Sequence, residues 1–323
     1  MMWISKGLST IFGGIMKKIC LVTHKADADG AFPIILAKLI YDDLEVFSCE
    51  VSEVHAVFES ILSRREEYDI IYVVDLCMDE EIADVINADE IFKKKIQVFD
   101  HHASRLFMNK YSFISVIDER NGRKECGTSL FYEYLKKISG NEILHKPILK
   151  TMIEYIREGD TYDFIEENKK EVFQFGSLYA IYGRVRYIEY FYDLVLNHDI
   201  FSFSETDKLL ISLEEEKTKL YIDEKMEHVK YACISGVRVG IVFAEQRRSL
   251  LGHEMAEKLD IDIAIVINVD RSVSYRADKD YVDVSLLAIP NGGGGHKHAG
   301  GSPLSVGLQE QIVNLIFKEV EWL

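Results

Sequence analysis

Short apolar runs that each end in an acidic or imidazole side chain constrain the fold of this chain most. Stretches with helical apolar spacing separate the runs, at residues 34–40, 54–62 and 80–87. Buried strands that alternate with helices predict an α/β domain with a parallel sheet. The runs are Lys18–Thr23, Asp69–Asp75 and Ile96–Phe99, and residues 46–49 predict a further strand between the first two. Because ligands bind at the carboxyl ends of parallel strands, we expect the polar residues that end these runs to meet at one edge of the sheet.

These polar residues form a set that suits a divalent cation. They are His24, Asp27 and Asp29 after the first run, Asp75 at the end of the second, and Asp100, His101 and His102 after the third. Carboxylate oxygens and imidazole nitrogens together suit Mn, Zn or Fe in the divalent state. The plain alternative for the first loop is Asp29 as a helix N-cap and Asp27 as a turn residue. Convergence of all three strand ends favours the metal site.

Further along, Asp160 follows an amphipathic helix at residues 149–156 and is a candidate last ligand, with Asp163 as the competing choice. Before that helix, residues 126–130 predict the start of another one. Gly127, Thr128 and Ser129 there could present amides or hydroxyls to a phosphate, and plain N-capping explains them equally well. Residues 205–229 predict a charged connecting helix with a solvated face.

The C-terminal part predicts a second α/β domain that ends in a glycine-rich run. Strands are expected at residues 237–243, 263–268, 272–276 and 282–287, with a helix at 250–259. The run Gly292–Gly295 is followed by His296, Lys297 and His298. Successive glycines cannot fill a core, and their bare amides can bind anions. A flexible linker is the alternative, but the histidines and the position after a strand favour phosphate or nucleotide binding.

A length of 323 residues predicts about two domains. We expect a catalytic domain at 17–195, a helical linker at 196–230 and a substrate-binding domain at 231–323. Residues 1–16 have no cleavage pattern of a signal peptide, so we interpret them as a disordered lead or as a start codon placed too early, with Met16 as the true start. No stretch approaches the ~18 apolar residues of a membrane span.

Composition narrows the class of partner. The net charge of −16 argues against a broad basic surface that coats nucleic acid. It allows a small nucleotide substrate, because bound cations make a carboxylate cluster locally positive. The five cysteines are scattered without a CxxC pair, which predicts reduced thiols in a cytoplasmic protein.

Taken together, the motifs resemble the DHH phosphoesterases with a DHHA1 C-terminal domain. The matching motifs are His24-x-x-Asp27-x-Asp29-Gly30, Asp75 after an apolar strand, Asp100-His101-His102, Asp160 after a helix, and the glycine-histidine run at 292–301. They occur in the order of the family and span nearly the whole chain. The resemblance implies an N-terminal parallel-sheet DHH domain joined by a helical linker to a smaller α/β DHHA1 domain.

The resemblance also implies roles for the site residues. His24, Asp27 and Asp75 would hold one metal ion, and Asp29, Asp75, His101 and Asp160 the other, with Asp75 bridging. The catalytic triplet would divide its work: Asp100 supports His101, and His102 contacts the scissile phosphate. Substrate contacts would come from Arg276, Gly293, Gly294, Gly295 and His296, with Arg247 and Arg248 assisting. For the adjacent arginines, a salt-bridged surface pair is the alternative.

These expectations define a hydrolase. Two cations in such a site lower the pKa of a bound water and stabilise both oxygens of an in-line displacement, without a covalent enzyme intermediate. We predict a Mn-dependent phosphodiesterase, with Mg, Co or Fe as alternatives, of the nanoRNase type. Its substrates would be short RNA and linear dinucleotides such as pApA or pGpG, and its products mononucleotides.

Alternative functions remain open from the sequence. They are a cyclic-dinucleotide phosphodiesterase, a single-strand DNA exonuclease and, outside catalysis, a nucleotide-binding sensor. We expect no membrane association and no stable complex with long nucleic acid, and a homodimer is compatible with the sequence. Substrate length, base and sugar identity, and direction of attack are left open.

Overall fold

The computed structural model describes residues 17–161, 163, 169–234, 236–269, 272–304, 307, 311 and 314–316, without the side chain of His296. Our interpretation of residues 1–16 lies outside the described residues. Contacts divide the chain into two compact units, Met1–Ile211 and Ser212–Leu323. The expected limits of the domains and linker stay predictions.

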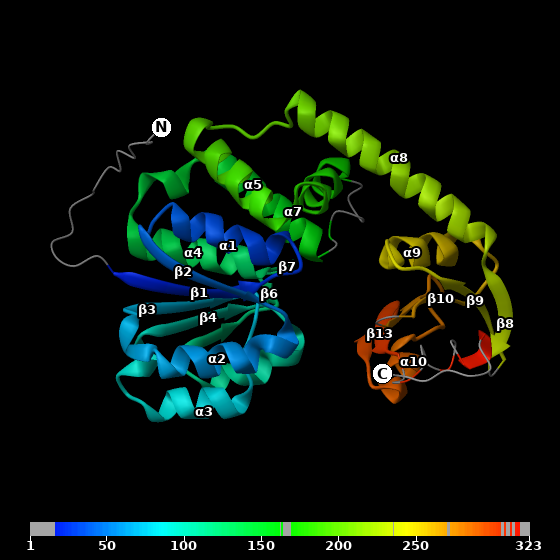
Figure 1. The fold of residues 1–323 in the computed structure, drawn as a ribbon, viewed down its shortest axis with the longest axis horizontal. Helices are drawn as coiled ribbons and strands as arrows, with labels where there is room; N and C mark the ends of the chain where they lie inside the picture. Colours follow the sequence, from blue (N-terminus) through cyan, green and yellow to red (C-terminus); the bar gives the residue numbers. More distant parts are fainter. Residues whose placement is uncertain are drawn as a thin grey trace. The chain divides into compact units, whose positions relative to one another are not determined.

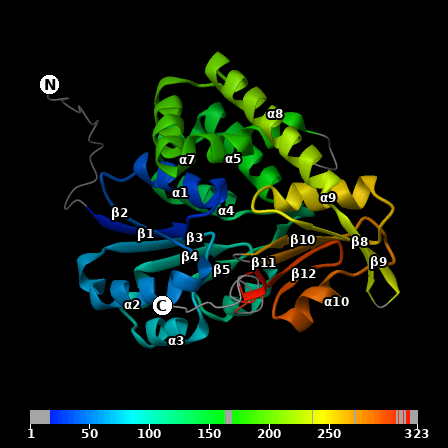
Figure 2. The same cartoon turned by 45° about the vertical axis from the view of Figure 1, so that its right-hand side comes forward.

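A parallel sheet forms the centre of the first unit, with the strand order β2-β1-β3-β4-β5 (Figures 1 and 2). The strands are β1 (Lys18–His24), β2 (Asp43–Cys49), β3 (Ile70–Val74), β4 (Ile96–Asp100) and β5 (Ile114–Val116). The predicted strands are all present, and the short β5 was not predicted. The predicted α/β class with an N-terminal parallel sheet is therefore confirmed.

Helices cover both faces of this sheet (Figures 1 and 2). One face carries α2 (Val54–Ser63) and α3 (Glu80–Ala88). The other carries α1 (Ala28–Lys38), α4 (Gly127–Ser139), α5 (Pro147–Thr161) and α7 (Lys170–Asn197). A two-stranded ribbon of β6 (Glu119–Arg120) and β7 (Arg123–Lys124) precedes α4. Covering both faces explains why the strands are continuous apolar runs.

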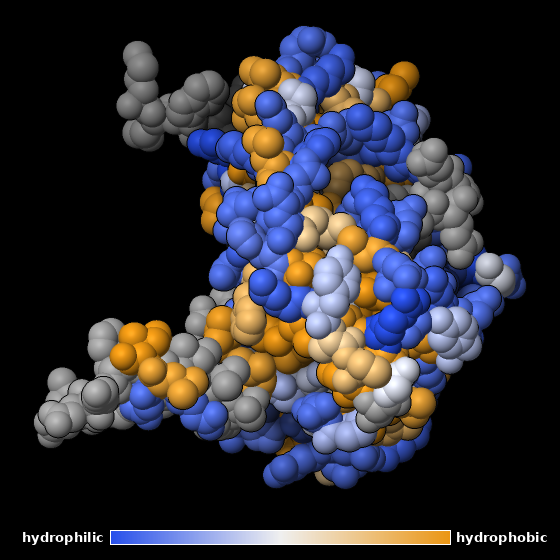
Figure 3. Space-filling view, turned by 90° about the vertical axis from the view of Figure 1, so that its right-hand side faces the viewer, coloured by the Kyte–Doolittle hydropathy of each residue, from blue (hydrophilic) through white to orange (hydrophobic). Residues whose placement is uncertain are grey.

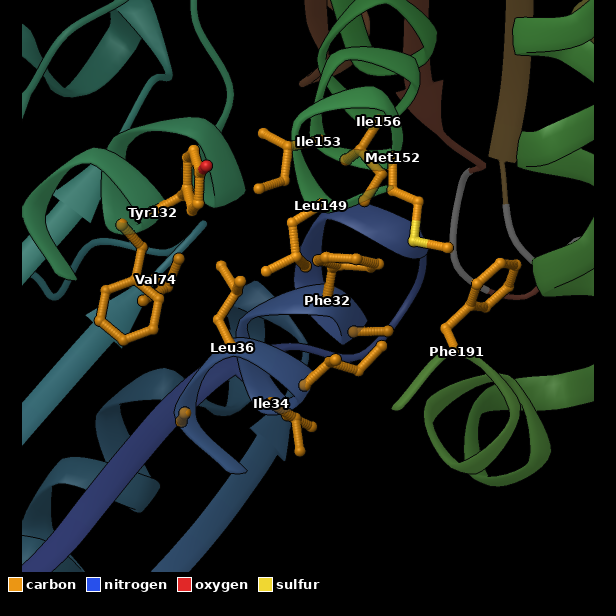
Figure 4. Packing of buried hydrophobic residues seen from close by; sticks show 14 of the residues in the cluster. Phe32, Ile34, Leu36, Val74, Tyr132, Leu149, Met152, Ile153, Ile156 and Phe191 are labelled. Carbon is orange, nitrogen blue, oxygen red and sulfur yellow. The ribbon is translucent and has the colours of Figure 1, made fainter. Parts of the chain in front are cut away.

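The larger core of the unit lies between the sheet and the second group of helices (Figure 4). Side chains from α1, α4, α5, α7 and β3 point toward one another there. They include Phe32, Leu36, Val74, Tyr132, Leu149, Met152 and Phe191. Apolar side chains that are withdrawn from water stabilise the fold by roughly 25 cal/mol per Å². This packing holds the helices that carry site residues against the strand ends.

The first helix shows how neighbouring elements satisfy one another. Pro33 lies inside α1 and has no N–H to donate to the carbonyl of Asp29, four residues earlier. The hydroxyl of Thr128 donates to that carbonyl instead, at 2.8 Å. The proline therefore leaves no buried acceptor unsatisfied, and it makes α1 depend on the start of α4.

The second unit contains a mixed sheet with the order β12-β13-β11-β10-β9-β8. Helix α8 (Glu205–Glu227) leads into it. Its elements are β8 (Lys230–Ile234), β9 (Val237–Phe243), α9 (Arg248–Lys258), β10 (Ile263–Asn268), β11 (Ser272–Arg276), α10 (Ser285–Ala288), β12 (Gly294–His296) and β13 (Ala299–Pro303). Strands β9 and β10 are parallel, and the other pairs are antiparallel. The second α/β unit is confirmed.

One predicted element of this unit is wrong. Residues 282–287 were expected to form a strand, but residues 282–284 form a turn and the rest belong to α10. The carboxylate of Asp283 accepts hydrogen bonds from the amide and the hydroxyl of Ser285, two residues later, and so stabilises this turn. The neighbouring place beside β11 is taken by β13. A local side-chain turn and a competing strand therefore override the apolar pattern.

Apolar side chains lie among hydrophilic ones on the surface of the chain (Figure 3). On β8 and β9 the large exposed ones are Tyr231, Ile234 and Phe243. No helix in the described ranges combines the length and the apolar character that a membrane span requires.

Candidate metal centre

The carboxyl ends of β1, β3 and β4 bring the predicted ligands together, as the parallel topology requires. Asp75 directly follows β3 and has a left-handed backbone with φ 59°. Aspartate tolerates this conformation better than most residues. The backbone N–H of Asp75 donates to the carbonyl of Phe99 at 2.9 Å, which ties the turn to β4. The side chain of Asp75 is buried between two groups of candidate ligands.

The first group consists of His24, Asp27 and Asp75. Nδ1 of His24 lies 3.5 Å from Oδ2 of Asp27 and 3.5 Å from Oδ2 of Asp75. Asp27 is also the N-cap of α1, because its Oδ1 accepts the N–H of Gly30 at 2.9 Å. The alternative that made Asp29 the N-cap and Asp27 a turn residue is therefore wrong, because Asp27 is the N-cap. The other carboxylate oxygen of Asp27 faces His24.

The second group consists of Asp29, His101 and Asp160. Nε2 of His101 lies 3.4 Å from Oδ2 of Asp160 and 3.8 Å from Oδ2 of Asp29. It also lies 3.2 Å from Oδ1 of Asp75. The two oxygens of Asp75 therefore face one imidazole each, in different groups.

Helix α4 fixes the position of Asp29. The amides of Gly127 and Thr128 donate to Oδ2 and Oδ1 of Asp29, each at 2.8 Å. The unpaired amides of a helix N-terminus favour a negative charge at this point. Our interpretation of this helix start as a phosphate site is wrong for these two amides, because a carboxylate of the protein already occupies them.

The structure distinguishes Asp160, on α5, from Asp163, the competing candidate for the last ligand. Asp160 joins the second group of ligands. Asp163 instead accepts a hydrogen bond from Arg157 at 2.7 Å and lies 3.4 Å from Nζ of Lys124. Asp160 therefore has the placement of a ligand, and Asp163 that of a salt-bridge partner.

Asp100 supports the ring of His102. Its Oδ1 lies 2.7 Å from Nδ1 of His102 and accepts the backbone N–H of His101 at 2.8 Å. The sequence led us to expect support for His101, whose ring instead faces Asp75. Asp100 is fully buried, whereas 51% of the His102 side chain is exposed. The ring of His102 is therefore held by a buried carboxylate while about half of its side chain stays exposed.

Burial and mutual charge shift the protonation of these groups. Hydrogen bonds with Asp27 and Asp75 raise the pKa of His24 to about 10. Burial lowers the pKa of His101, but Asp75, Asp29 and Asp160 outweigh it and raise this pKa to about 10. Burial raises the pKa of Asp160 to about 6, against the opposing charge of His101.

Asp75 and Asp29 shift in opposite directions. Burial opposes ionisation of Asp75, but hydrogen bonds with His101 and His24 prevail and lower its pKa to about 2. For Asp29, burial and the nearby Asp75 raise the pKa well above its ordinary value. Acidic groups that share so small a volume need positive charge to stay ionised together.

The residues present fit divalent cations. Oδ2 of Asp160 is buried and has no hydrogen-bond partner among the described residues, although buried polar atoms are normally satisfied. Asp29 and His101 supply a carboxylate and an imidazole beside Asp160, and His24, Asp27 and Asp75 form the neighbouring group. A cation in each group would neutralise these carboxylates and satisfy that oxygen.

Loading the site with Mn²⁺ is expected to release protons. The rings of His24 and His101 hold protons in the metal-free protein below their raised pKa of about 10, and an imidazole must be neutral to bind a metal. Apparent affinity should therefore rise with pH, by up to about tenfold per pH unit for each displaced proton. Titration calorimetry in buffers of different ionisation enthalpy measures this release. Affinity that stays constant between pH ~6.5 and ~8.5 would contradict the expectation.

Sequence reasoning missed Glu50. This residue follows β2, which pairs with β1, and its Oε2 lies 3.3 Å from Nε2 of His24. A carboxylate on the second ring nitrogen orients a metal-binding histidine. The signal was available, because Glu50 is a further acidic residue directly after a predicted strand.

In the second unit, the predicted substrate arginines have partners within the protein. Arg276 donates to the carbonyl of Tyr275 at 2.8 Å and to the hydroxyl of Ser249 at 3.0 Å. Arg247 forms an ion pair with Glu214. Arg248, at the start of α9, hydrogen-bonds Ser272. For the adjacent arginines we had considered substrate contacts or a salt-bridged surface pair, and Arg247 forms a salt bridge. Binding of substrate by these residues stays a prediction.

The glycine run forms a hairpin with close backbone approach. Strand β12 pairs with β13 through Gly294, Gly295 and His296. A Cβ on Gly293 would lie 2.0 Å from the carbonyl oxygen of Gly301, so only glycine fits there. The amide of Gly293 donates to the carbonyl of Ala288 and is not bare. The predicted role of the His296 side chain lies outside the described residues.

Comparisons with known proteins agree with this description. No protein-family model matches the chain. The chain is 29% identical over 306 residues to the oligoribonuclease NrnB of Bacillus subtilis (strain 168), covering 92% of this chain and 76% of that protein.

Among solved structures, the DHH domain of a protein described as a member of a ribosomal protein family matches with a TM-score of 0.57 at 15% identity. This match covers 93% of this chain and 86% of that one, and it shows the fold. A pGpG-specific phosphodiesterase, PggH, from a Vibrio species matches with a TM-score of 0.48 at 14% identity, over 93% and 97% of the two chains, and we draw no conclusion from it.

Fold and motifs thus define the class of protein that the chain resembles, the DHH phosphoesterases. The particular relative is NrnB, an oligoribonuclease, to which the chain is similar over most of its length. The resemblance to a DHH/DHHA1 phosphoesterase of the nanoRNase type is therefore confirmed.

Proposed function

We propose that this chain is a metal-dependent phosphodiesterase that hydrolyses short RNA and linear dinucleotides to mononucleotides. One observation carries the proposal: Asp75 is buried between the His24–Asp27 pair and the Asp29–His101–Asp160 group, with one carboxylate oxygen toward each. A nucleotide-binding sensor would not need this complete set. Similarity to an oligoribonuclease supports short RNA as the substrate class.

In this proposal the protein holds two divalent cations, with Mn as the expected metal. When bound, the cations supply an activated water and offset negative charge on the phosphate. His24, Asp27 and Asp75 would hold one, and Asp29, Asp75, His101 and Asp160 the other. The conformations of these residues are already set by α1, α4 and the turn after β3, so the site is largely preorganised.

His102 would contact the scissile phosphate. Its hydrogen bond with Asp100 raises the pKa of the ring above that of an ordinary histidine. Nδ1 faces Asp100, and Nε2 is left to donate to a phosphate oxygen. The fully buried carboxylate of Asp100 keeps the ring in this orientation.

A direct experiment tests the proposal. The protein is incubated with Mn²⁺ and a labelled RNA dinucleotide, beside a variant that carries Asp100→Ala and His101→Ala. We expect mononucleotides from the unmutated protein and none above background from the variant. Binding of the dinucleotide without any turnover by the unmutated protein would support a sensor instead. A series of RNA and DNA from two to about ten residues then measures preferred length and the need for a 2′-hydroxyl.

Arg276→Ala is expected to impair hydrolysis of a dinucleotide far more than that of a small chromogenic phosphodiester. The difference should reach about 10-fold or more in kcat/KM, as for the loss of one charged hydrogen bond. Arg238→Ala is the control, since Arg238 is an exposed arginine of the same unit that pairs with Asp260. Equal losses on both substrates would remove Arg276 from substrate binding.

A further inference from the structure

Arg184, on α7, reaches the loop that carries the first metal-ligand group. Its Nη1 donates to the carbonyl of His24 at 2.9 Å, and its Nη2 to the carbonyl of Gly30 at 3.2 Å. Nη2 also donates to the hydroxyl of Ser48, at the end of β2, at 2.8 Å. One guanidinium thus joins the end of β1 to the first turn of α1, on both sides of the loop between them, and connects both to the neighbouring strand.

A second donor from α7 reaches the same loop. The hydroxyl of Tyr179 donates to the carbonyl of Lys25 at 2.7 Å. The ends of the loop are so close that a Cβ on Gly30 would lie 2.0 Å from the carbonyl oxygen of His24. This closeness allows one guanidinium, with its fixed fork of donors, to contact both carbonyls.

A break in α7 precedes Arg184 and sets its direction. Gly183 has φ 68° and ψ 158° inside the helix, a region that is almost restricted to glycine. Nothing surrounds the position where its Cβ would be. Glycine is therefore needed there for its backbone conformation and not for space.

We propose that Arg184 is a positioning residue for the His24–Asp27–Asp75 metal group. The inference rests on the proposed function and extends it. Arg184 fixes the backbone on both sides of Asp27, so that the His24 ring and the Asp27 carboxylate keep the spacing that a cation requires. Loss of supporting contacts around metal ligands typically lowers metal affinity by about 10–100-fold.

A competing role is binding of the substrate phosphate by Arg184. Positioning predicts weaker Mn²⁺ binding and an unchanged KM once Mn²⁺ is saturating. Phosphate binding predicts the reverse, a raised KM with unchanged Mn²⁺ affinity. A merely structural role predicts a lower melting temperature with both values unchanged.

The test is Arg184→Gln in the full chain, with Mn²⁺ binding measured by titration calorimetry and by electron paramagnetic resonance of bound Mn²⁺. We expect one of the two Mn²⁺ ions to bind about 10–100-fold more weakly and the other nearly as before. Tyr179→Phe, which removes a single hydroxyl, is a milder variant and should shift the same ion less. Arg186→Gln is the matched control, because Arg186 is an exposed arginine two residues along the same helix.

Unchanged Mn²⁺ affinity in Arg184→Gln would overturn the inference, whether or not KM or the melting temperature changes. The unmutated protein tests the proposed function separately. If it binds no Mn²⁺ or leaves the dinucleotide intact, the proposed function fails. If the unmutated protein binds Mn²⁺ and hydrolyses the dinucleotide, and Arg184→Gln behaves identically, only the role of Arg184 fails.

Discussion

Asp75→Asn is expected to reduce hydrolysis of an RNA dinucleotide by about 10³-fold or more, because it removes a carboxylate that belongs to the His24 group and also lies 3.2 Å from His101 of the other group. Asparagine is close to aspartate in shape and tolerates the left-handed backbone at φ 59°. The fold should therefore persist while metal binding is lost. Activity, Mn²⁺ stoichiometry and the circular dichroism spectrum measure these three consequences.

Asp69→Asn is the matched control for this variant. Asp69 immediately precedes β3, is exposed, and accepts the backbone N–H of Lys18 at 2.8 Å. We expect near-normal activity and Mn²⁺ binding from it. Full Mn²⁺ occupancy in Asp75→Asn would contradict a shared ligand, even if activity were lost.

Gly127→Ala is expected to damage the site without changing a polar group. A Cβ at this position would lie 2.6 Å from Cβ of Asp75 and 2.7 Å from its backbone nitrogen. Since neither atom belongs to a flexible side-chain end, α4 or the turn after β3 must move. Overpacking of this kind costs about 1–3 kcal/mol in the free energy of unfolding. Movement of α4 would also displace Asp29, so Mn²⁺ should bind at least about tenfold more weakly.

Gly176→Ala controls for the change from glycine to alanine in a helix. Gly176 lies in α7 with open space around its Cβ position, and alanine is favoured there by up to about 1 kcal/mol. Chemical unfolding of the metal-free proteins and Mn²⁺ titration compare the two variants. If Gly127→Ala were as stable as Gly176→Ala, the turn after β3 would accommodate the added methyl group, and the expectation would be wrong.

Much of the centre was predictable because strand ends are visible in a sequence. Apolar runs marked β1, β3 and β4, and the polar residue types after them indicated metal chemistry. The parallel sheet then places these ends together, so His24, Asp75 and His101 meet despite their separation along the chain. The separation of Asp160 from Asp163 needed the structure, because it depends on which side of α5 faces the sheet.

Other features depend on tertiary contacts that leave no local pattern. The aromatic-rich stretch at residues 179–192 was not predicted as part of a helix, and α7 is interrupted at Gly183. Nothing near Arg184 in the sequence indicates that its side chain reaches the carbonyl of His24. The residues at 282–287 show the converse, because an apolar pattern was overridden by the hydrogen-bonded turn at Asp283 and by β13.

The bond between Arg184 and His24 joins residues that are 160 positions apart in the chain. During synthesis at about 5–20 residues per second, His24 and the loop after it are therefore made roughly 8–32 s before Arg184. Closing so long a loop is slow compared with forming β1 and α1, which are adjacent in sequence. A cation that binds the nascent chain in this interval contacts His24 and Asp27 before Arg184 can hold their backbone in place. We expect tight metal uptake to mark the end of folding of the first unit.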